Sequence, residues 1–488
     1  MSTAQTQQPG TTGSVRRGLW AGVAVFAVVL LLPLPLPPAA QRTAAVAALM
    51  SAWWLTEAVP LAVTSLVPLV LFPALGVLSA TDAAAPYANP VVFLFLGGFV
   101  VAMAMQRWGL HRRMALAIVA RAGARPHTLV LGFMLATAFL SMWVSNTATA
   151  AMMIPIGLAL AELLRPPETD NAAFPFGTAL MLGIAYAATI GGIATLIGTP
   201  PNAVLAASAV ELAGRTISFT SWLTVGLPVT LVLLPAAWAL LVFVLFRSPA
   251  LPAGAHEMLQ IERRRLGPRS RAETIVAVVF TSMAVAWLLR QPKQIGDVTL
   301  PGLTSLAPWI DDATIAMAGA VLLFLLPSGE RRPILVWEDT RELPWGVLIL
   351  FGGGLSLARA FDDSGLTTAF GEMVVAFHTL PLWLLIGATA ALFILLSELA
   401  SNTAVAAMGM PVLAAAGQGL GYDPMIFMVV GALASSAAFM LPVGTPPNAI
   451  AFGTGYISMR DMIRAGALLN VLSVIVCTLA ALLLGSRI

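Results

Sequence analysis

The sequence predicts an all-α, polytopic membrane protein, and three observations support that fold class. Of its 488 residues, 59% are hydrophobic and only 10% are charged, and the mean hydropathy is +0.91. The apolar residues gather into runs long enough to cross a bilayer, and two polar motifs occur twice. A water-soluble chain carries about 25% charged residues. A chain this apolar therefore requires the lipid bilayer as its solvent.

The N-terminal residues 1–17 are polar and rich in Thr, Gln and Gly, and they predict a disordered tail. The first apolar run, 18–38, follows Arg16 and Arg17 directly. A cleaved signal peptide is the competing interpretation, because residues 38–40 resemble a small-residue cleavage site. The run is longer than the roughly 7–15 apolar residues of a signal peptide, which favours a membrane span.

Eleven apolar runs come close to the roughly 20 residues that a helix needs to cross the hydrocarbon core. They are 18–38, 42–57, 60–79, 90–106, 174–198, 221–246, 271–290, 312–328, 343–361, 423–444 and 464–485. Two further stretches, 128–164 and 380–417, are about twice as long, and each has Ser-Asn-Thr near its middle. Backbone breaks at membrane depth are tolerated only inside protein or along a cavity. We therefore expect two re-entrant helical hairpins with the triplets at their tips.

The distribution of basic residues predicts the orientation. With the N-terminus cytoplasmic and the C-terminus external, 19 of the 25 Lys and Arg residues fall on the cytoplasmic side and 6 outside. This is the asymmetry that the positive-inside rule requires. Counting each long stretch as two full spans gives the same orientation, so the count supports the orientation and leaves re-entrance open.

An internal repeat carries the polar chemistry. Residues 141–155 and 397–411 are identical at nine of fifteen positions, and both contain Ser-Asn-Thr. Downstream of each copy follows Gly-Thr-Pro-Pro-Asn-Ala, at 198–203 and at 444–449. Five spans and one hairpin per half give the copies opposite orientations. Inverted repeats with interrupted segments at matching places predict a transport site near the bilayer midplane.

The residue types of the motifs indicate which ligands such a site would bind. Hydroxyl and amide oxygens suit a hard cation such as sodium. The paired prolines break a helix, which exposes carbonyls on one side and a helix N-terminus that attracts anions on the other. No Lys or Arg occurs between residues 126 and 164 or between 360 and 458, so helix termini, hydroxyls, amides and co-bound cations would have to offset the charge of an anion. Packing of helices in lipid is the bland alternative, and the duplication of both motifs argues against it.

Other chemistry-bearing residues lie outside this pattern. Glu398 has Met142 as its counterpart, so we expect a structural hydrogen-bonding role in its hairpin, with direct coupling to transport as the alternative. Glu57 is expected to be a cap or an inter-helix anchor, and Gly352–Gly354 a place of close helix packing. The four His residues lack metal-ligand spacing, and a single Lys rules out an ATP-binding loop. No His lies in either hairpin to act as the base of a hydrolase, so no enzyme is expected, and no nucleic-acid partner.

These motifs, with Trp54–Ala58 and Pro344–Gly354, resemble the divalent anion–sodium symporter family from about residue 18 to the end. Its members move succinate, malate, fumarate, citrate or sulfate. The resemblance implies eleven spans with two re-entrant hairpins, a homodimer, and an elevator motion of a transport domain against a scaffold.

The resemblance also implies the site residues. The sodium ligands would be Ser141, Ser145, Asn146 and Gly198 in one site, and Ser397, Ser401, Asn402 and Gly444 in the other. The substrate carboxylates would be held by Ser145, Asn146, Thr147, Thr199, Pro200, Ser401, Asn402, Thr403, Thr445 and Pro446. Gly444 stands where the family often has Ala, which leaves a backbone carbonyl ligand unaffected.

The resulting scheme assigns 18–126 and 271–379 to the scaffold, 127–246 and 380–488 to the transport domain, and 247–270 to a basic cytoplasmic loop. We expect sodium-coupled uptake of four-carbon dicarboxylates. We expect the membrane to be a bacterial inner membrane, since the dominance of Arg over Lys is typical of GC-rich bacterial genomes. A sodium-independent dicarboxylate exchanger and a citrate or sulfate carrier of the same fold are the alternatives.

Overall fold

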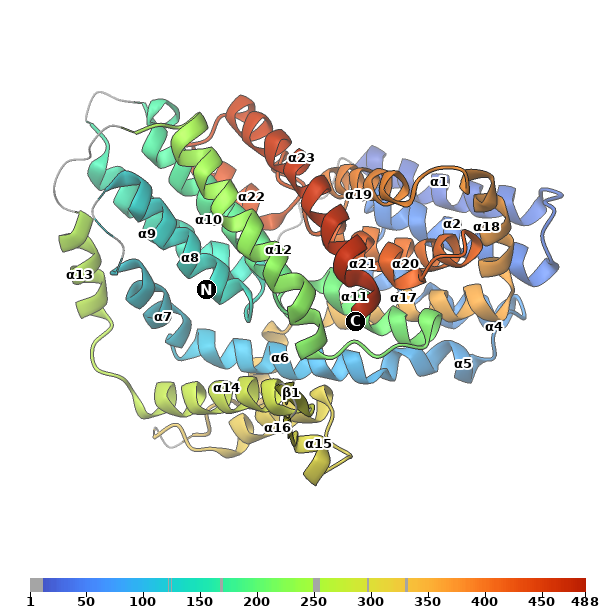
Figure 1. The fold of residues 1–488 in the computed structure, drawn as a ribbon, viewed down its shortest axis with the longest axis horizontal. Helices are drawn as coiled ribbons and strands as arrows, with labels where there is room; N and C mark the ends of the chain where they lie inside the picture. The colour runs from blue at the N-terminus through green and yellow to red at the C-terminus, as the bar shows by residue number, and fades with distance from the viewer. Residues whose placement is uncertain are drawn as a thin grey trace.

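The computed structural model describes residues 12–121, 123, 125–166, 170–248, 255–295, 298–329 and 332–488, which form a predominantly helical molecule (Figure 1). The helices before the basic loop are α1 (Thr12–Leu31), α2 (Pro38–Thr56), α3 (Leu61–Thr64), α4 (Val67–Ala74), α5 (Ala80–Ala84), α6 (Pro90–Arg107), α7 (Leu110–Val119), α8 (Pro126–Ser141), α9 (Asn146–Leu164), α10 (Pro175–Ile193), α11 (Pro200–Ala213) and α12 (Phe219–Ala239).

The second part of the chain contains α13 (Ala255–Arg265), α14 (Arg271–Leu289), α15 (Leu303–Leu306), α16 (Asp312–Leu325), α17 (Trp345–Asp363), α18 (Leu366–Val374), α19 (Leu382–Leu399), α20 (Asn402–Gly419), α21 (Pro424–Ser435), α22 (Pro446–Phe452) and α23 (Met459–Leu484). A short antiparallel hairpin of β1 (Lys293–Ile295) and β2 (Val298–Leu300) follows α14. The basic loop 247–270 is partly helical, because α13 lies within it. The last turn of α13 contains Arg263–Arg265.

The internal repeat extends further than the sequence motifs. In both halves a long helix, α6 or α17, ends at a glycine with positive φ: Gly109 at 73° and Gly365 at 75°. A short helix, α7 or α18, starts at the next residue, and a helix pair, a broken helix and a final helix follow in the same order. At both turns the backbone adopts the left-handed conformation, which favours glycine because glycine carries no Cβ. The two halves therefore share one architecture.

Both predicted hairpins are pairs of helices that turn at the Ser-Asn-Thr triplets. Ser145 is the N-cap of α9 and Ser401 the N-cap of α20, so each second helix begins at the Asn of its triplet. The arms of each pair, α8 with α9 and α19 with α20, contact each other. The helix–turn–helix form of the prediction is confirmed, whereas the depth of the tips in a membrane stays a prediction.

By length and composition, eight helical segments of the described residues could cross a membrane. They are Ala80–Arg107, Asn146–Leu164, Pro175–Ile193, Phe219–Leu245, Arg271–Leu289, Trp345–Asp363, Leu382–Leu399 and Met459–Arg487. Two of them, α9 and α19, are arms of the predicted hairpins, and five shorter apolar helices accompany them. The count of eleven spans stays a prediction.

Several predicted boundaries were wrong. Residues 12–17 belong to α1, which ends at Leu31 ahead of Pro33, Pro35 and Pro37, while 1–11 lie outside the described residues. The predicted span 60–79 is divided into α3 and α4. The predicted spans 174–198 and 423–444 are longer than the helices observed. Helix α10 ends at Ile193 and helix α21 ends at Ser435, and a non-helical segment follows each of them.

The two halves interlock through their repeated elements. Helix α20 packs along α11, and α22 packs along both α9 and α10. Every residue of α10 after its first is buried, which makes it the centre of this bundle. A second layer of α14 and α16 packs against α6, visible along the lower edge in Figure 1.

The remaining sequence predictions concern packing. In Gly352–Gly354, a Cβ at Gly353 would lie 2.4 Å from the carbonyl oxygen of Ser65, so this run allows close helix packing as predicted. Glu57 occupies the C-cap of α2 with φ 47°. Its predicted position at the end of the helix is confirmed, and its role as a cap or anchor stays a prediction.

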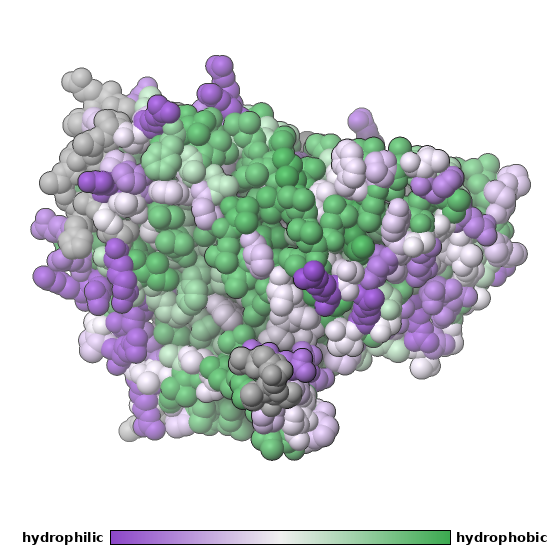
Figure 2. Space-filling model, in the orientation of Figure 1, coloured by the Kyte–Doolittle hydropathy of each residue, from purple (hydrophilic) through white to green (hydrophobic). Residues whose placement is uncertain are grey.

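An apolar surface covers the middle of the face seen in Figure 2, over α12 and α23, with hydrophilic residues toward the left and right ends. On α23 the exposed apolar residues recur every three or four positions and form one stripe: Leu468, Val471, Ile475, Leu479 and Leu483. Such a stripe on an outer helix is suited to contact with lipid tails.

Candidate functional site

The first Ser-Asn-Thr triplet lies in a cluster of four oxygen-bearing groups. The Asn146 amide faces Ser141 Oγ at 2.7 Å and the carbonyl oxygens of Ala188 and Gly198 at 3.1 and 3.3 Å. With its nitrogen toward them, the amide donates hydrogen bonds to these groups; with its oxygen toward them, it completes a set of four oxygens. Hydroxyl, amide and carbonyl oxygens are the ligands that hard cations prefer. The residue types are those predicted for a sodium site, and sodium binding here stays a prediction.

Three of the four predicted ligands of this site come together, and one does not. Ser141, Asn146 and Gly198 belong to the cluster, whereas Ser145 caps α9 by accepting a hydrogen bond from Ala148 N at 3.3 Å. Sequence reasoning missed Ala188, whose carbonyl accepts a hydrogen bond from Ser141 Oγ at 2.6 Å. A backbone carbonyl has no signature of its own in the sequence.

The neighbouring glycines Gly191 and Gly192 are the feature of the sequence that could have indicated how closely α10 approaches the hairpin of α8 and α9. A Cβ at Gly191 would lie 2.3 Å from the carbonyl oxygen of Ala138 on α8, and one at Gly192 would lie 2.4 Å from Asn146 Oδ1. Both distances are too short for any side chain. The two glycines therefore let the hairpin of α8 and α9 lie directly against α10.

The helix breaks of both repeats are held by an asparagine that was not predicted as a site residue. Asn202 Nδ2 lies 3.2, 3.3 and 2.8 Å from the carbonyl oxygens of Gly192, Ile193 and Thr195. In the second repeat, Asn448 Nδ2 lies 3.5 and 3.1 Å from those of Ala438 and Leu441. Each of these asparagines is the last residue of Gly-Thr-Pro-Pro-Asn, and its side chain reaches back across the break in the helix. They satisfy carbonyls that lost their helical partners.

The second triplet has a different environment. Ser397 Oγ and Asn402 Oδ1 are buried and have no hydrogen-bond partner in the described part of the chain. Next to Ser397, the carboxylate of Glu398 lies beside Gly444, where an added Cβ would be 2.9 Å from Glu398 Oε2. The structure thus brings Glu398 and Gly444 together. It gives no hydrogen bond between Ser397, Asn402 and Gly444, and the Ser401 side chain makes no capping bond.

The predicted substrate residues lie at the first turns of four helices. Ser145, Asn146 and Thr147 start α9, and Ser401, Asn402 and Thr403 start α20. Thr199 and Thr445 are the N-caps of α11 and α22, whose first residues are Pro200 and Pro446. A helix N-terminus presents free N–H groups and a partial positive charge, which favours carboxylates. This provides anion-binding groups without a basic side chain.

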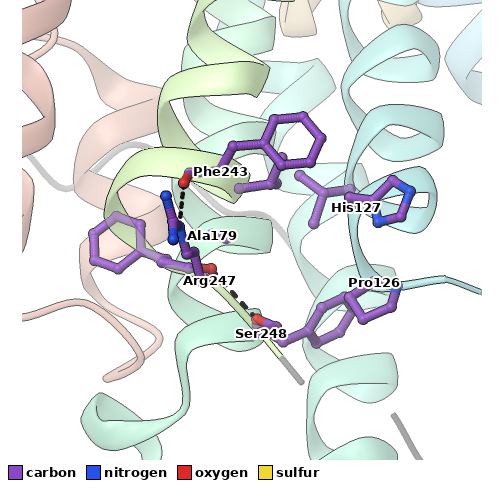
Figure 3. Close-up of a pocket in the computed structure, with 10 residues that line it drawn as sticks. Pro126, His127, Ala179, Phe243, Arg247 and Ser248 are labelled. Atoms are coloured by element: carbon purple, nitrogen blue, oxygen red, sulfur yellow. Dashed lines mark hydrogen bonds between the residues drawn. The ribbon is translucent and has the colours of Figure 1, made fainter. Parts of the chain in front are cut away.

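One cavity among the described residues lies away from the first triplet, at the start of α8. It has a volume of about 190 Å³, and its lining includes Pro126, His127, Phe243 and Arg247 (Figure 3). Arg247 Nε donates to the carbonyl of Phe243. Since a helix rises about 1.5 Å per residue, Pro126 is about 22 Å along α8 from Ser141. This cavity is therefore separate from the first triplet, and no residue of either triplet lines it.

Comparison with known proteins places the chain in a family. The family model described as the sodium:sulfate symporter transmembrane region matches residues 16–487. The chain belongs to this family. The sodium:sulfate symporter family and the apolar helices together make it an integral membrane protein.

Two relatives within this family carry the same name. The sodium-dependent dicarboxylate transporter SdcS of Staphylococcus saprophyticus is 40% identical over 473 residues, covering 95% of this chain and 90% of its own length. The protein of that name from Staphylococcus aureus strain MRSA252 is 40% identical over 489 residues, covering 98% and 92%.

Solved structures share the fold at low sequence identity. The Alcanivorax borkumensis YdaH transporter matches with a TM-score of 0.56 and 17% identity, covering 83% of this chain and 88% of its own. Neisseria gonorrhoeae MtrF matches with a TM-score of 0.56 and 12% identity, covering 84% and 83%. These likenesses support the all-α fold.

Proposed function

We propose that this protein is a secondary active transporter that couples sodium entry to the uptake of four-carbon dicarboxylates such as succinate, malate and fumarate. The observation that carries the proposal is the oxygen cluster of Ser141, Asn146, Ala188 and Gly198 at the first triplet. It combines a hydroxyl, an amide and two backbone carbonyls, which are groups whose oxygens hard cations accept as ligands. The names of the relatives support sodium and dicarboxylates as the ligands.

The charge of the site supports coupled binding. The segments that form the site, 126–164, 174–214 and 360–458, contain no Lys or Arg. A dicarboxylate would therefore rely on helix N-termini, hydroxyls and nearby cations. One sodium ion at each repeat would neutralise a dianion, and without sodium the anion would enter a nonpolar bundle uncompensated, which is costly. Sodium and substrate thus favour each other's binding.

The mechanism proposed for the transport step is an elevator. In this scheme α8–α12 and α19–α23 move as one transport domain against a scaffold that includes α1–α6 and α14–α17. Interlocking of α20 with α11 and of α22 with α9 supports treating the site-forming elements as one body. A homodimer, a cytoplasmic N-terminus and a location in a bacterial plasma membrane complete the proposal.

Uptake of labelled succinate into proteoliposomes tests the function. An inward sodium gradient is expected to drive succinate to a higher concentration inside than outside, and lithium or potassium to replace sodium poorly. Excess malate or fumarate should compete, because they present two carboxylates at a similar separation. Liposomes without protein are the control.

Three results would contradict this assignment. Counterflow of succinate at equal rate without sodium would identify an exchanger. Strong competition by sulfate or by citrate, with weak competition by malate, would identify a sulfate or citrate carrier with the same coupling. The absence of any succinate uptake under an inward sodium gradient would refute the proposal for these substrates.

A further inference from the structure

The carboxylate of Glu398 is buried and fully engaged by N–H donors. The residue is 1% exposed on α19. Its Oε1 accepts hydrogen bonds from Phe439 N, Met440 N and Asn470 Nδ2 at 2.8, 2.7 and 2.7 Å, and its Oε2 accepts from Leu441 N at 2.8 Å. Every one of these partners is a donor, so they complement the negative charge of a carboxylate, which only accepts hydrogen bonds when it is ionised. The expected structural role is confirmed, because Glu398 holds the non-helical segment after α21.

This negative charge has no positive partner in the described structure. None of the ion pairs formed by the described residues includes Glu398. The sequence between residues 360 and 458 contains no Lys or Arg. Hydrogen bonds reduce the cost of a buried charge, but an isolated ion in a low-dielectric interior still attracts a cation strongly.

The carboxylate lies beside groups that suit a cation. A Cβ at Gly444 would be 2.9 Å from Glu398 Oε2, so the backbone of this predicted ligand is close to the charged oxygen. Ser397, the preceding residue of the chain, is 0% exposed, and its Oγ has no partner in the described part of the structure. An alanine at position 444 would bring its Cβ to 2.9 Å from Oε2, so the carboxylate would have to shift.

The first repeat has no such charge. Its counterpart of Glu398 is Met142, whose carbonyl accepts a hydrogen bond from Thr195 Oγ1. The groups of the first cluster, from Ser141, Asn146, Ala188 and Gly198, are all uncharged. The two repeats therefore offer a cation the same kind of ligands but different electrostatic potentials.

We propose that Glu398 makes the two sodium sites unequal: its charge lets the site at Ser397 and Gly444 bind sodium more tightly, so that this site fills first. The inference rests on the proposed sodium coupling. Glu398 acts as a positioning residue for the backbone of 439–441 and as a source of negative potential, and sodium need not touch it. A unit charge a few ångströms away changes the affinity for a monovalent cation by about tenfold or more.

Equilibrium binding of ²²Na⁺ to the purified full-length protein without dicarboxylate tests this inference. The unchanged protein should show a tight and a weak phase. Glu398→Gln should weaken the tight phase about tenfold or more. Ser141→Ala should affect the weak phase instead. Asn470→Ala removes one hydrogen bond from Glu398 but leaves the charge, so it should shift the tight phase by less than about threefold.

The outcomes separate charge from scaffolding. An unchanged tight phase in Glu398→Gln, or an equal loss in Asn470→Ala, would overturn the inference. If Glu398→Gln does not fold, Met142→Glu provides the second variant, because it places a carboxylate at the matching position of the first repeat and should tighten the weak phase; an unchanged weak phase in that variant would also overturn the inference. If the unchanged protein binds no sodium, the proposed function itself fails. If it binds sodium with two equal affinities, only this inference fails.

Discussion

Replacing Asn146 by alanine is expected to weaken succinate binding by about tenfold or more at every sodium concentration, because an unmet buried polar partner costs roughly 1–3 kcal/mol. The Asn146 amide lies against Ser141 and the carbonyls of Ala188 and Gly198, at the first residue of α9. From there one end of the amide would contact the cation and the other the carboxylate. Alanine removes both contacts. Asn402→Ala, at the first residue of α20, should behave in the same way.

The serine variants provide the matched controls. Ser141→Ala and Ser397→Ala should weaken sodium binding directly and succinate binding only through its linkage to sodium, since coupling between two ligands is reciprocal. Saturating sodium should therefore restore succinate affinity in the serine variants but not in the asparagine variants. If Asn146→Ala and Asn402→Ala bind succinate normally at all sodium concentrations, the triplets are not the substrate site.

Replacing Asn202 by aspartate is expected to destabilise the fold by about 3 kcal/mol or more, because it turns a buried donor toward three carbonyl oxygens into a charged acceptor. Asn202 is 0% exposed, and its amide spans the break between α10 and α11. Asn202→Ala should cost about 1–3 kcal/mol, since it leaves the carbonyls unpaired without adding a charge. Thermal unfolding followed by tryptophan fluorescence measures both.

The comparison variants come from the same elements. Val210→Ala on α11 changes a side chain that is 39% exposed and should stay within about 0.5 kcal/mol of the original stability. Asn448→Ala should cost less than Asn202→Ala, because its amide makes longer contacts with only two carbonyls, at 3.5 and 3.1 Å. Equal stability of Asn202→Asp and the unchanged protein would show that the amide does not hold the break.

The sequence allowed the repeated architecture to be predicted because its signals are local. Proline pairs, span-length apolar runs and a duplicated triplet each depend on a few neighbouring residues. The turns at Ser145-Asn146 and Ser401-Asn402 followed directly from the triplets. The ends of α10 and α21 did not, because the segments after Ile193 and Ser435 are as apolar as the helices before them. Hydropathy measures burial in lipid and does not register a broken backbone.

The members of the first cluster were predictable where they belong to the repeated motifs. Ser141, Asn146 and Gly198 were found from the repeat and the resemblance, whereas the carbonyl of Ala188 became visible only when α8 and α10 were placed together. The proximity of Glu398 to Gly444 joins residues from α19 and the segment after α21. Such contacts depend on tertiary packing, and no spacing in the sequence encodes them.

The dependence of succinate affinity on sodium, measured at equilibrium on the purified protein, tests the central claim most directly. If sodium and the dicarboxylate occupy one shared site, succinate affinity must rise steeply as sodium increases, and sodium affinity must rise by the same factor with succinate. We expect this reciprocal increase, with potassium at equal ionic strength producing none. A succinate affinity that is the same with and without sodium would contradict the account.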